Sequence, residues 1–275
     1  AVARLLGYNW PQQTSDALDC LADADGIVCL PAVSGEQPAT ERLRGLLMAA
    51  YNQPPSLPDP NVYNLQSPDL PFAQLTDGWS LTVQQRLLTH VGYAGKSLDD
   101  WLRDGFFEQH CQHFENRPFI WHLWDGRRDG FNALVNYHKL DHAALNRLIY
   151  TYLGYWIETQ RAARDAGEAG ADGRLVAALE LQKKLEAIRD GEKPYDIYVR
   201  WKPLHEQPIG WQPDLNDGVR LNIRPFVHAG ILRRKFTIDW TKDLGKNPDG
   251  TERINDRHYT RAEKEAARRA HGIQV

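Results

Sequence analysis

The sequence predicts an α+β fold that is predominantly helical, with a few short antiparallel strands. Apolar residues recur at helical spacing over long stretches, most clearly between Asp141 and Asp190. The strand-like runs are short, are bounded by turn residues and fall around residues 119–137 and 195–226. The parts that we expect are an N-terminal helical segment with a Pro-rich linker (1–80), a helical core with a hairpin and a Trp/Pro-rich strap (81–226), and a basic C-terminal tail (227–275).

The N-terminal part combines helix, strand and linker patterns. An apolar face that begins at Val2 predicts a first helix, Ile27 to Leu30 predict a short strand, and Thr40-Glu41 open a second helix. The second helix places four core candidates at helical spacing, namely Leu43, Leu46, Leu47 and Ala50. Residues 52–80 contain six Pro and no periodicity, which is typical of a linker; a target-reading loop is the alternative.

Residues 81–116 return to a helical pattern. One helix ends near Gly92, and Ser97 is placed to cap the next, with Asp100 three residues later. The core candidates of that next helix are Trp101, Leu102, Phe106, Phe107 and Phe114. Paired Asp99 and Asp100 invite an acid–base interpretation, but the helix dipole alone favours carboxylates in a first turn.

A β-hairpin is predicted after this helix. Residues 119–124 and 131–137 are strand-like, and the turn between them, D-G-R-R-D-G, places Arg127 and Arg128 at its tip. Guanidinium groups at a turn reach phosphates or a guanine edge, and Lys139 follows just beyond the second strand. The hypothesis is a DNA-contacting hairpin, and the alternative is a solvated basic turn.

Two amphipathic helices come next. Asp141 is placed as the N-cap of the first, whose apolar stripe is Leu145, Leu148, Ile149, Tyr152, Leu153, Trp156 and Ile157. The second runs from Arg174 to Asp190 and ends at Gly191, with core candidates Leu175, Leu179, Leu181, Leu185 and Ile188. A short Gly-rich link predicts that the two helices form an antiparallel hairpin, able to brace two domains of a larger enzyme.

The strap, residues 201–226, is the densest run of fixed backbone geometry in the chain. Pro203, Pro208 and Pro213 prevent a regular helix or a central strand, and Trp201 and Trp211 are placed to anchor the segment.

The end of the strap is predicted to turn and then to form a strand. Asn216-Asp217-Gly218 is a turn signal, and the alternation of Val219 to Arg224 predicts a half-buried strand. On that interpretation Arg220, Asn222 and Arg224 share one solvent-facing side. A surface strap that only covers a core is the alternative.

Charge is distributed unevenly. Residues 220–275 contain 13 Lys and Arg and 7 Asp and Glu, which gives this segment a net charge of +6. Because the whole chain has a net charge of −3, residues 1–219 have a net charge of −9. Arg233, Arg234, Lys235 and a final helix rich in Arg concentrate the positive charge. A basic end on an acidic chain is typical of a phosphate-contacting element, with double-stranded DNA as partner, while a solvated tail is the alternative.

Composition excludes several classes. With 42% hydrophobic and 25% charged residues the chain is of ordinary globular type, and no run of about 18 apolar residues predicts a membrane span. The apolar start is interrupted by Arg4, unlike the apolar region of a signal peptide. The three cysteines, Cys20, Cys29 and Cys111, are odd in number and have no paired spacing, so we expect no disulfide framework and a cytoplasmic protein. His110, Cys111 and His113 invite a metal site, but a helix face with a buried Cys is the preferred interpretation, and no metal is expected.

Three long motifs resemble a known family. G-W-Q-P-D-L-N-D-G-V-R-L-N-I-R-P-F, Y-D-I-Y-V-R-W-K-P and R-P-F-I-W-H-L-W-D-G are similar to the carboxy-terminal portion of large adenine-specific DNA methyltransferases. These are the type IIG restriction–modification methylases and the related methyltransferases of the BREX and DISARM phage-defence systems. The resemblance extends over most of the chain. It implies a segment of a longer protein, consistent with a start that lacks Met, and it assigns no residue roles.

The catalytic motifs of that family have no counterpart in the sequence. An F-x-G-x-G loop would cradle S-adenosylmethionine, and an (N/D/S)-P-P-(Y/F) loop would hold a flipped adenine. Asp69-Leu70-Pro71-Phe72 lacks the first Pro of the second motif, and Asn247-Pro248-Asp249-Gly250 is an ordinary turn. We therefore expect no catalytic residue and no cofactor in this chain, with S-adenosylmethionine bound by a methyltransferase domain elsewhere in the parent.

Three functions are compatible with the sequence. The preferred one is a DNA-engaging or bracing region, whose contact candidates are Arg127, Arg128, Lys139, Arg220, Arg224, Arg233, Arg234 and Lys235. The second is a scaffold that docks subunits of a defence complex without touching DNA. The third, a hydrolase that uses Asp214 and Asp217, is disfavoured because Asp is common in turns for conformational reasons.

Overall fold

The computed structural model describes residues 24–52, 81–196, 202–236, 249 and 259–275. It confirms the predicted class, because these residues form mainly helices together with a small three-stranded antiparallel sheet of order β1-β3-β2. The chain divides into two compact units, one of residues 1–121 with 132–135 and one of residues 122–131 with 136–275. The division falls within the β2–β3 hairpin, where the sequence predicts no boundary.

Unit 1 is built from short helices and a strand pair. Its elements are β1 (Ile27–Cys29), α3 (Ala39–Asn52), α4 (Leu81–His90), α5 (Leu98–Asp104), α6 (Phe106–His113) and most of β3 (Asn132–Asn136). The predicted strand at Ile27 is confirmed as β1, which pairs antiparallel with β3 so that Ile27 faces Val135 and Cys29 faces Ala133. The predicted first helix, the Pro-rich linker and Cys20 lie outside the described residues.

The helical pattern between residues 97 and 114 forms two helices instead of one. Ser97 caps α5 as predicted, in a capping box with Asp100. The chain then breaks at Gly105, where a Cβ atom would collide with the ring of Tyr93, so the close approach of that ring requires glycine. Trp101 and Phe106 are fully buried as predicted, whereas Phe114 is only partly buried.

Unit 2 contains the remaining described elements. They are most of β2 (Ile120–Trp124), η2 (Tyr137–Lys139), α7 (His142–Asn146), η3 (Arg147–Leu153), α8 (Gly154–Asp165), α9 (Ala171–Asp190), η4 (Leu204–Glu206), η5 (Leu215–Asp217), α10 (Gly218–Asn222), α11 (Arg224–His228) and α13 (Arg261–Ala270). The predicted hairpin is confirmed by β2, its turn and β3.

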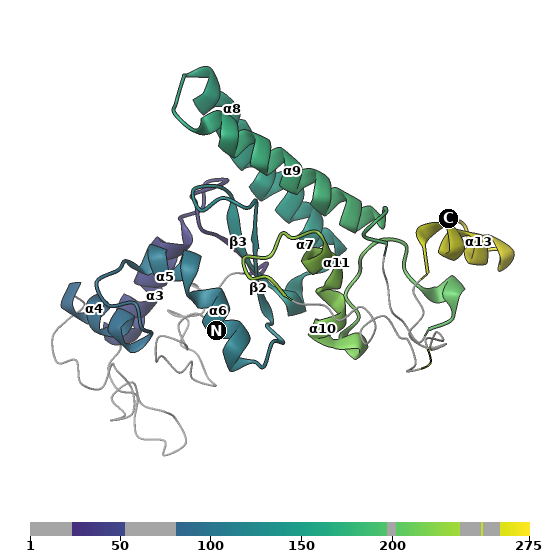
Figure 1. Cartoon of the computed structure of the whole chain (residues 1–275), viewed down its shortest axis with the longest axis horizontal. Coiled ribbons are helices and arrows are strands. Elements are labelled where there is room, and N and C mark those ends of the chain that lie inside the picture. Colours follow the sequence, from purple (N-terminus) through teal and green to yellow (C-terminus); the bar gives the residue numbers. More distant parts are fainter. Residues whose placement is uncertain (1–23, 53–80, 197–201, 237–248, 250–258) are drawn as a thin grey trace, which may run out of the picture. The chain divides into compact units, whose positions relative to one another are not determined.

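A helical hairpin forms the long element of unit 2. The side chain of Asp141 accepts a hydrogen bond from the backbone N–H of Ala144, which begins α7 as predicted. α7, η3 and α8 then follow one another without a break, with η3 wound as a π-helix, and α8 lies beside α9 (Figure 1). The predicted apolar stripe of the first helix is buried, except that Trp156 is only partly buried. On α9, Leu179 is exposed, contrary to the prediction, because Leu175, Ala178, Leu181, Leu185 and Ile188 already form the buried stripe.

The strap is irregular from residue 202 to 217, as its prolines predict. Two 3₁₀ turns, η4 and η5, interrupt extended backbone. Trp211 is buried, and its indole N–H donates to the carbonyl oxygen of Asn222 over 2.8 Å, so the predicted anchor is confirmed. Trp201 lies outside the described residues.

The strand predicted at residues 219–223 is wrong, because the chain forms α10 and α11 there. The cause is Asn222, whose side chain is buried and satisfied only in the helical conformation. Its amide nitrogen lies 2.9 Å from the hydroxyl of Tyr137, 2.9 Å from the carbonyl oxygen of Asp214 and 2.7 Å from that of Gly218. Its amide oxygen accepts from the backbone N–H of Asp214 over 2.9 Å. The amide oxygen of Asn222 and its two amide N–H groups, which have three acceptors within reach, are thereby satisfied, and these buried hydrogen bonds outweigh the alternating hydrophobic pattern.

The end of α9 and the strap meet through two glycines. Gly191 and Gly210 both have positive φ, of 67° and 80°. A Cβ atom on Gly191 would lie 2.6 Å from the backbone nitrogen of Gly210, and one on Gly210 would overlap the carbonyl oxygen of Arg189. The two backbones therefore approach each other more closely than any side chain allows.

The predicted C-terminal helix is confirmed as α13, and it packs on η4 of the strap. Thr260 caps α13 in a capping box with Glu263. Lys264 is buried, Arg268 donates to the carbonyl oxygen of Gln207 over 3.0 Å, and the rings of His205 and His271 stack 3.8 Å apart. Part of the positive charge of this helix thus makes contacts within unit 2.

Candidate nucleic-acid interface

The β2–β3 turn has a locked backbone. The carboxylate of Asp125 accepts from the backbone N–H of Arg127 over 3.0 Å and from that of Phe131 over 2.8 Å. Burial raises the pKa of Asp125, while these two N–H groups oppose that shift. A Cβ atom on Gly130 would collide with this carboxylate, so glycine is required at the end of the turn. The backbone of the predicted D-G-R-R-D-G turn, which contains the two arginines, is therefore fixed by the Asp125 carboxylate.

The two arginines of the turn have different surroundings. Arg127 forms a fork with Asp129, in which Nε lies 3.1 Å from Oδ1 and Nη2 lies 3.2 Å from Oδ2. This hydrogen bond lowers the pKa of Asp129 and raises that of Arg127. Arg128 is exposed next to this pair. Both arginines are thus at the turn, as predicted, and Arg127 is ion-paired there.

A third arginine, Arg174 of α9, connects the turn to the helical hairpin. Its Nη1 lies 3.8 Å from the carboxylate of Asp129, and its Nε donates to the side chain of Gln160 over 2.6 Å. It also pairs with Glu168 and reaches the carbonyl oxygen of Ala169 in the link between α8 and α9. The turn and the tip of the hairpin therefore share one ionic network.

The basic run that follows α11 lies along β2. The backbone N–H of Trp124 donates to the carbonyl oxygen of Ile231 over 2.9 Å. The backbone N–H of Arg233 donates to the carbonyl oxygen of His122, also over 2.9 Å. These bonds flank an isolated antiparallel bridge between Leu123 and Leu232. They place Arg233 beside the strand that leads into the arginine turn.

Two consecutive arginines of this run stack on aromatic rings. The guanidinium carbon of Arg233 lies 4.2 Å from the ring centre of Trp124, and that of Arg234 lies 5.6 Å from the ring centre of Phe236. Lys235, which lies between Arg234 and Phe236 in the sequence, is exposed. Stacking fixes the plane of a guanidinium and leaves its N–H groups directed outward along the plane.

The other three candidates lie elsewhere in unit 2. Lys139 is exposed at the end of η2, and Arg220 is exposed on α10. Arg224 opens α11 and is buried, with 6% of its surface exposed. The predicted solvent-facing side of Arg220, Asn222 and Arg224 is therefore wrong for the last two, because the segment is helical.

The residues that invite metal or acid–base chemistry have structural roles. The Nε2 atom of His110 accepts from the backbone N–H of Ile120 over 3.1 Å, and burial lowers the pKa of His110 to about 4. Asp99 pairs with Arg103, and Asp214 accepts from the backbone N–H of Asn216. In the part of the chain that the structure describes, no three His, Cys, Asp or Glu side chains gather as metal ligands would.

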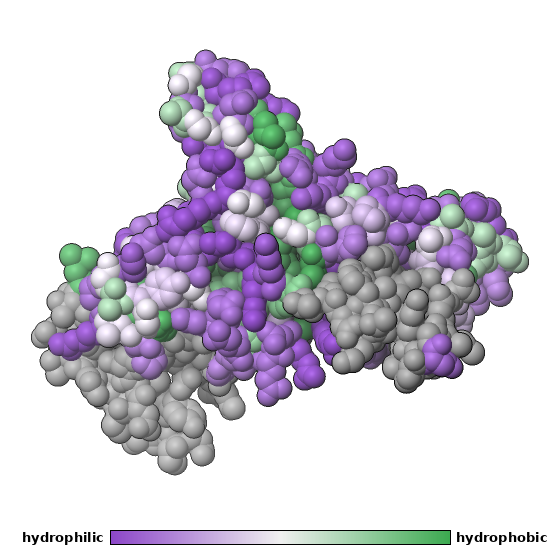
Figure 2. Space-filling model, viewed as in Figure 1, coloured by the Kyte–Doolittle hydropathy of each residue, from purple (hydrophilic) through white to green (hydrophobic). Residues whose placement is uncertain are grey.

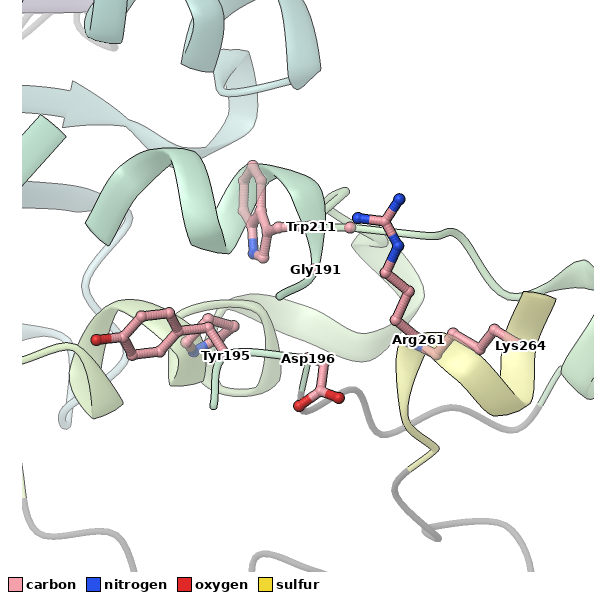
Figure 3. A pocket seen from close by; sticks show the side chains of 8 residues that line it. Gly191, Tyr195, Asp196, Trp211, Arg261 and Lys264 are labelled. Atoms are coloured by element: carbon pink, nitrogen blue, oxygen red, sulfur yellow. The ribbon is translucent and has the colours of Figure 1, made fainter. Parts of the chain in front are cut away.

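A small pocket with an internal volume of about 10 Å³, partly open to solvent, lies where α13 meets the end of α9 (Figure 3). Trp211 and Tyr195 line it together with Asp196, Arg261 and Lys264. Arg261 is anchored by a hydrogen bond to the carbonyl oxygen of Asp190 over 2.7 Å. Among the described residues, Oδ2 of Asp196 has no hydrogen-bond partner. Both charge signs face this space, so the pocket favours neither an anion nor a cation.

No protein-family model matches the chain, and no curated protein is significantly similar to it. Within the described ranges, no helix combines the length and the apolar character that a membrane crossing needs.

The sequence interpretation missed three residues of this interface, Trp124, Asp129 and Arg174. The strand pattern of residues 119–124 includes Trp124 but does not predict which residue its ring contacts. The one signal for Asp129 in the sequence is its place in the turn, two residues after an arginine of opposite charge. Arg174 lies 45 residues further along the chain, and no local pattern links it to the turn.

Proposed function

We propose that this chain is the carboxy-terminal, DNA-engaging region of an adenine-specific DNA methyltransferase of a restriction or phage-defence system. A separate domain of the same parent chain binds S-adenosylmethionine and transfers its methyl group to adenine N6. This region orients the duplex and is non-catalytic in isolation. The sequence motifs quoted above support the family, and the surface chemistry of unit 2 supports the contact with DNA.

One observation carries the proposal, namely the stacking of Arg233 on Trp124, next to the turn that contains Arg127 and Arg128. Sequence segments about a hundred residues apart thus contribute cations near the end of β2 that leads into the turn. Guanidinium groups with a fixed plane bind phosphate through two parallel N–H groups, and lysines beside them add unspecific attraction. This arrangement suits the backbone of double-stranded DNA.

The test replaces Arg233, Arg234 and Lys235 together with Ala in the whole chain. We expect duplex affinity to fall, and the slope of log K against log salt to become shallower by about 2 to 3, close to 0.9 for each lost phosphate contact. Titrations of a labelled duplex at several salt concentrations measure both quantities. The matched control removes three cations from the helical hairpin, Arg161, Lys183 and Lys184, and is expected to leave the slope nearly unchanged.

An unchanged slope in the first variant, with the fold intact by circular dichroism, would remove the basic run from the interface. If the wild-type chain has no measurable duplex affinity even at low salt, the DNA-engaging function itself is wrong.

A second function, a docking scaffold for subunits of a defence complex, is favoured by the helical hairpin. Large apolar side chains are exposed on it, namely Tyr150, Tyr155, Val176 and Leu179. Figure 2 shows hydrophobic residues among the hydrophilic ones on this element. The scaffold predicts that co-expressed subunits of the same defence operon co-purify with the chain. Replacement of Tyr155 and Val176 by polar residues should then abolish co-purification without changing any duplex affinity.

A further inference from the structure

The carboxylate of Asp129 lies between two guanidinium groups. Arg127 holds it through two hydrogen bonds of 3.1 and 3.2 Å, and Nη1 of Arg174 lies 3.8 Å away on another element. Gly173 contributes to this arrangement, since a Cβ atom there would lie only 3.3 Å from Nη1 of Arg127. The backbone of α9 thus leaves room for the Arg127 side chain. Arg127 and Arg174 of unit 2 therefore form an anion-binding site, called the seat below, and the carboxylate of Asp129 occupies it.

This ion pair is accessible and exchangeable. The side chains of Arg127 and Asp129 are 41% and 53% exposed, whereas that of Arg174 is 13% exposed and fixed by Gln160 and Glu168. Pairs between exposed charges contribute little to folding, so breaking this one leaves the fold intact. The low pKa of Asp129 keeps its carboxylate ionised at neutral pH, so the seat is occupied by a charged group.

The geometry of the fork is also that of arginine with phosphate. Guanidinium groups bind carboxylate and phosphate through the same pair of parallel N–H groups. A phosphate that enters this seat would replace Asp129 on Arg127 without any rearrangement of the Asp125 frame that holds the turn. Arg128, the next residue in the turn, is exposed.

We infer that the carboxylate of Asp129 occupies the place of a DNA backbone phosphate and that duplex DNA displaces it, so that Asp129 restrains the binding of the turn to DNA. The inference rests on the proposed function. In the absence of DNA, Asp129 neutralises Arg127 and weakens the attraction of the turn for non-specific duplex. In the presence of a well-placed duplex, other contacts such as Arg233 supply the attraction needed for the exchange.

The test is Asp129→Asn, which keeps the size of the side chain and removes its charge. In this variant the phosphate binds Arg127 without releasing a carboxylate that takes up a cation from solution, so the salt slope should steepen by about 0.9 and affinity should rise roughly tenfold at about 0.1 M salt. The matched control is Glu158→Gln, which removes one carboxylate from an equally exposed pair with Arg161 on α8. It changes net charge by the same amount and should raise affinity less than about twofold.

A double variant separates the seat from the general effect of charge. Adding Arg127→Ala to Asp129→Asn removes the guanidinium that the phosphate needs, so the gain in affinity and the steeper slope should both disappear. The inference is overturned if Asp129→Asn gains no more than Glu158→Gln, or if the double variant keeps the gain. Either result, obtained while the wild-type chain binds duplex, leaves the proposed function standing. If no chain binds duplex at low salt, both are overturned.

Discussion

A buried hydrogen bond joins Trp211 to Asn222 within the strap region. The indole N–H of Trp211 donates to the carbonyl oxygen of Asn222, and the amide of Asn222 reaches back to both backbone polar groups of Asp214. The same amide contacts the hydroxyl of Tyr137, which belongs to η2. One buried asparagine thus fixes a segment that has no regular secondary structure of its own.

Asn222→Ala is expected to destabilise the protein by on the order of 3 kcal/mol. The substitution leaves the backbone N–H and carbonyl of Asp214 and the carbonyl of Gly218 without their side-chain partner. Denaturant unfolding followed by tryptophan fluorescence measures the change. Tyr137→Phe removes a single hydrogen bond from the same group and should cost only about 1 kcal/mol. Equal costs for the two variants would contradict the central role of Asn222.

Gly210→Ala is expected to unfold or severely destabilise the strap, by about 3 kcal/mol or more. The new Cβ would overlap the carbonyl oxygen of Arg189, and the positive φ adds about 1 kcal/mol. Gly230→Ala is the matched control, because Gly230 has a φ of 67° and no atom near its Cβ position. It should show only the cost of the positive φ. Melting temperatures of the two variants, measured side by side, test the difference.

The buried His110 is expected to make unfolding dependent on pH. Its pKa is about 4 in the folded protein and about 6.5 in the unfolded chain, so unfolded molecules bind a proton first as the pH falls. The contribution to stability is complete above pH 6.5 and decreases towards pH 4, by on the order of 3 kcal/mol. His110→Gln keeps an acceptor for the N–H of Ile120 and removes the titration. Its unfolding free energy should fall less steeply over this pH range, and parallel curves for the two proteins would contradict the prediction.

Arg233→Lys tests whether the stacked guanidinium matters beyond its charge. Lysine keeps the positive charge but lacks the planar group that lies over Trp124 and that, in the proposed contact with DNA, supplies two N–H groups to a phosphate. We expect duplex affinity to fall about two- to fivefold with little change in the salt slope. Arg233→Ala should lower the affinity further and also reduce the slope. A lysine variant that binds as the wild type does would limit the role of Arg233 to its charge.

Much of the secondary structure could be predicted because its causes are local. The caps Ser97 and Asp141, the stripe that begins at Leu145 and the turn between β2 and β3 are each determined by residues within a few positions. The strand predicted at Val219 failed because its alternation was overruled by contacts of Asn222 with Tyr137, which lies 85 residues away. The alternating pattern favours a strand and the hydrogen bonds of Asn222 favour a helix, and the segment is helical.

The candidate interface was only partly predictable for the same reason. The sequence identifies Arg127, Arg128 and Arg233 as basic residues in suitable segments, but their neighbours come from elsewhere. Trp124 meets Arg233 through pairing of the chain with β2, and Arg174 meets Asp129 through the packing of the helical hairpin. Burial of Arg224 likewise follows from the helix that replaces the predicted strand. Charge can be counted from a sequence, whereas its accessibility depends on the packing of segments far apart in the chain.

The contact between Gly191 and Gly210 also limits which substitutions related sequences can accept at these two positions. A Cβ atom on Gly191 would meet the backbone of Gly210, and one on Gly210 would meet the backbone of Arg189 and Asp190, so a substitution at either position separates the end of α9 from the strap. Relatives that retain this crossing are expected to retain both glycines, and those that lose one should show compensating insertions between them. A pair of positions that changes together would then identify distant members of this lineage after their overall sequence similarity has faded.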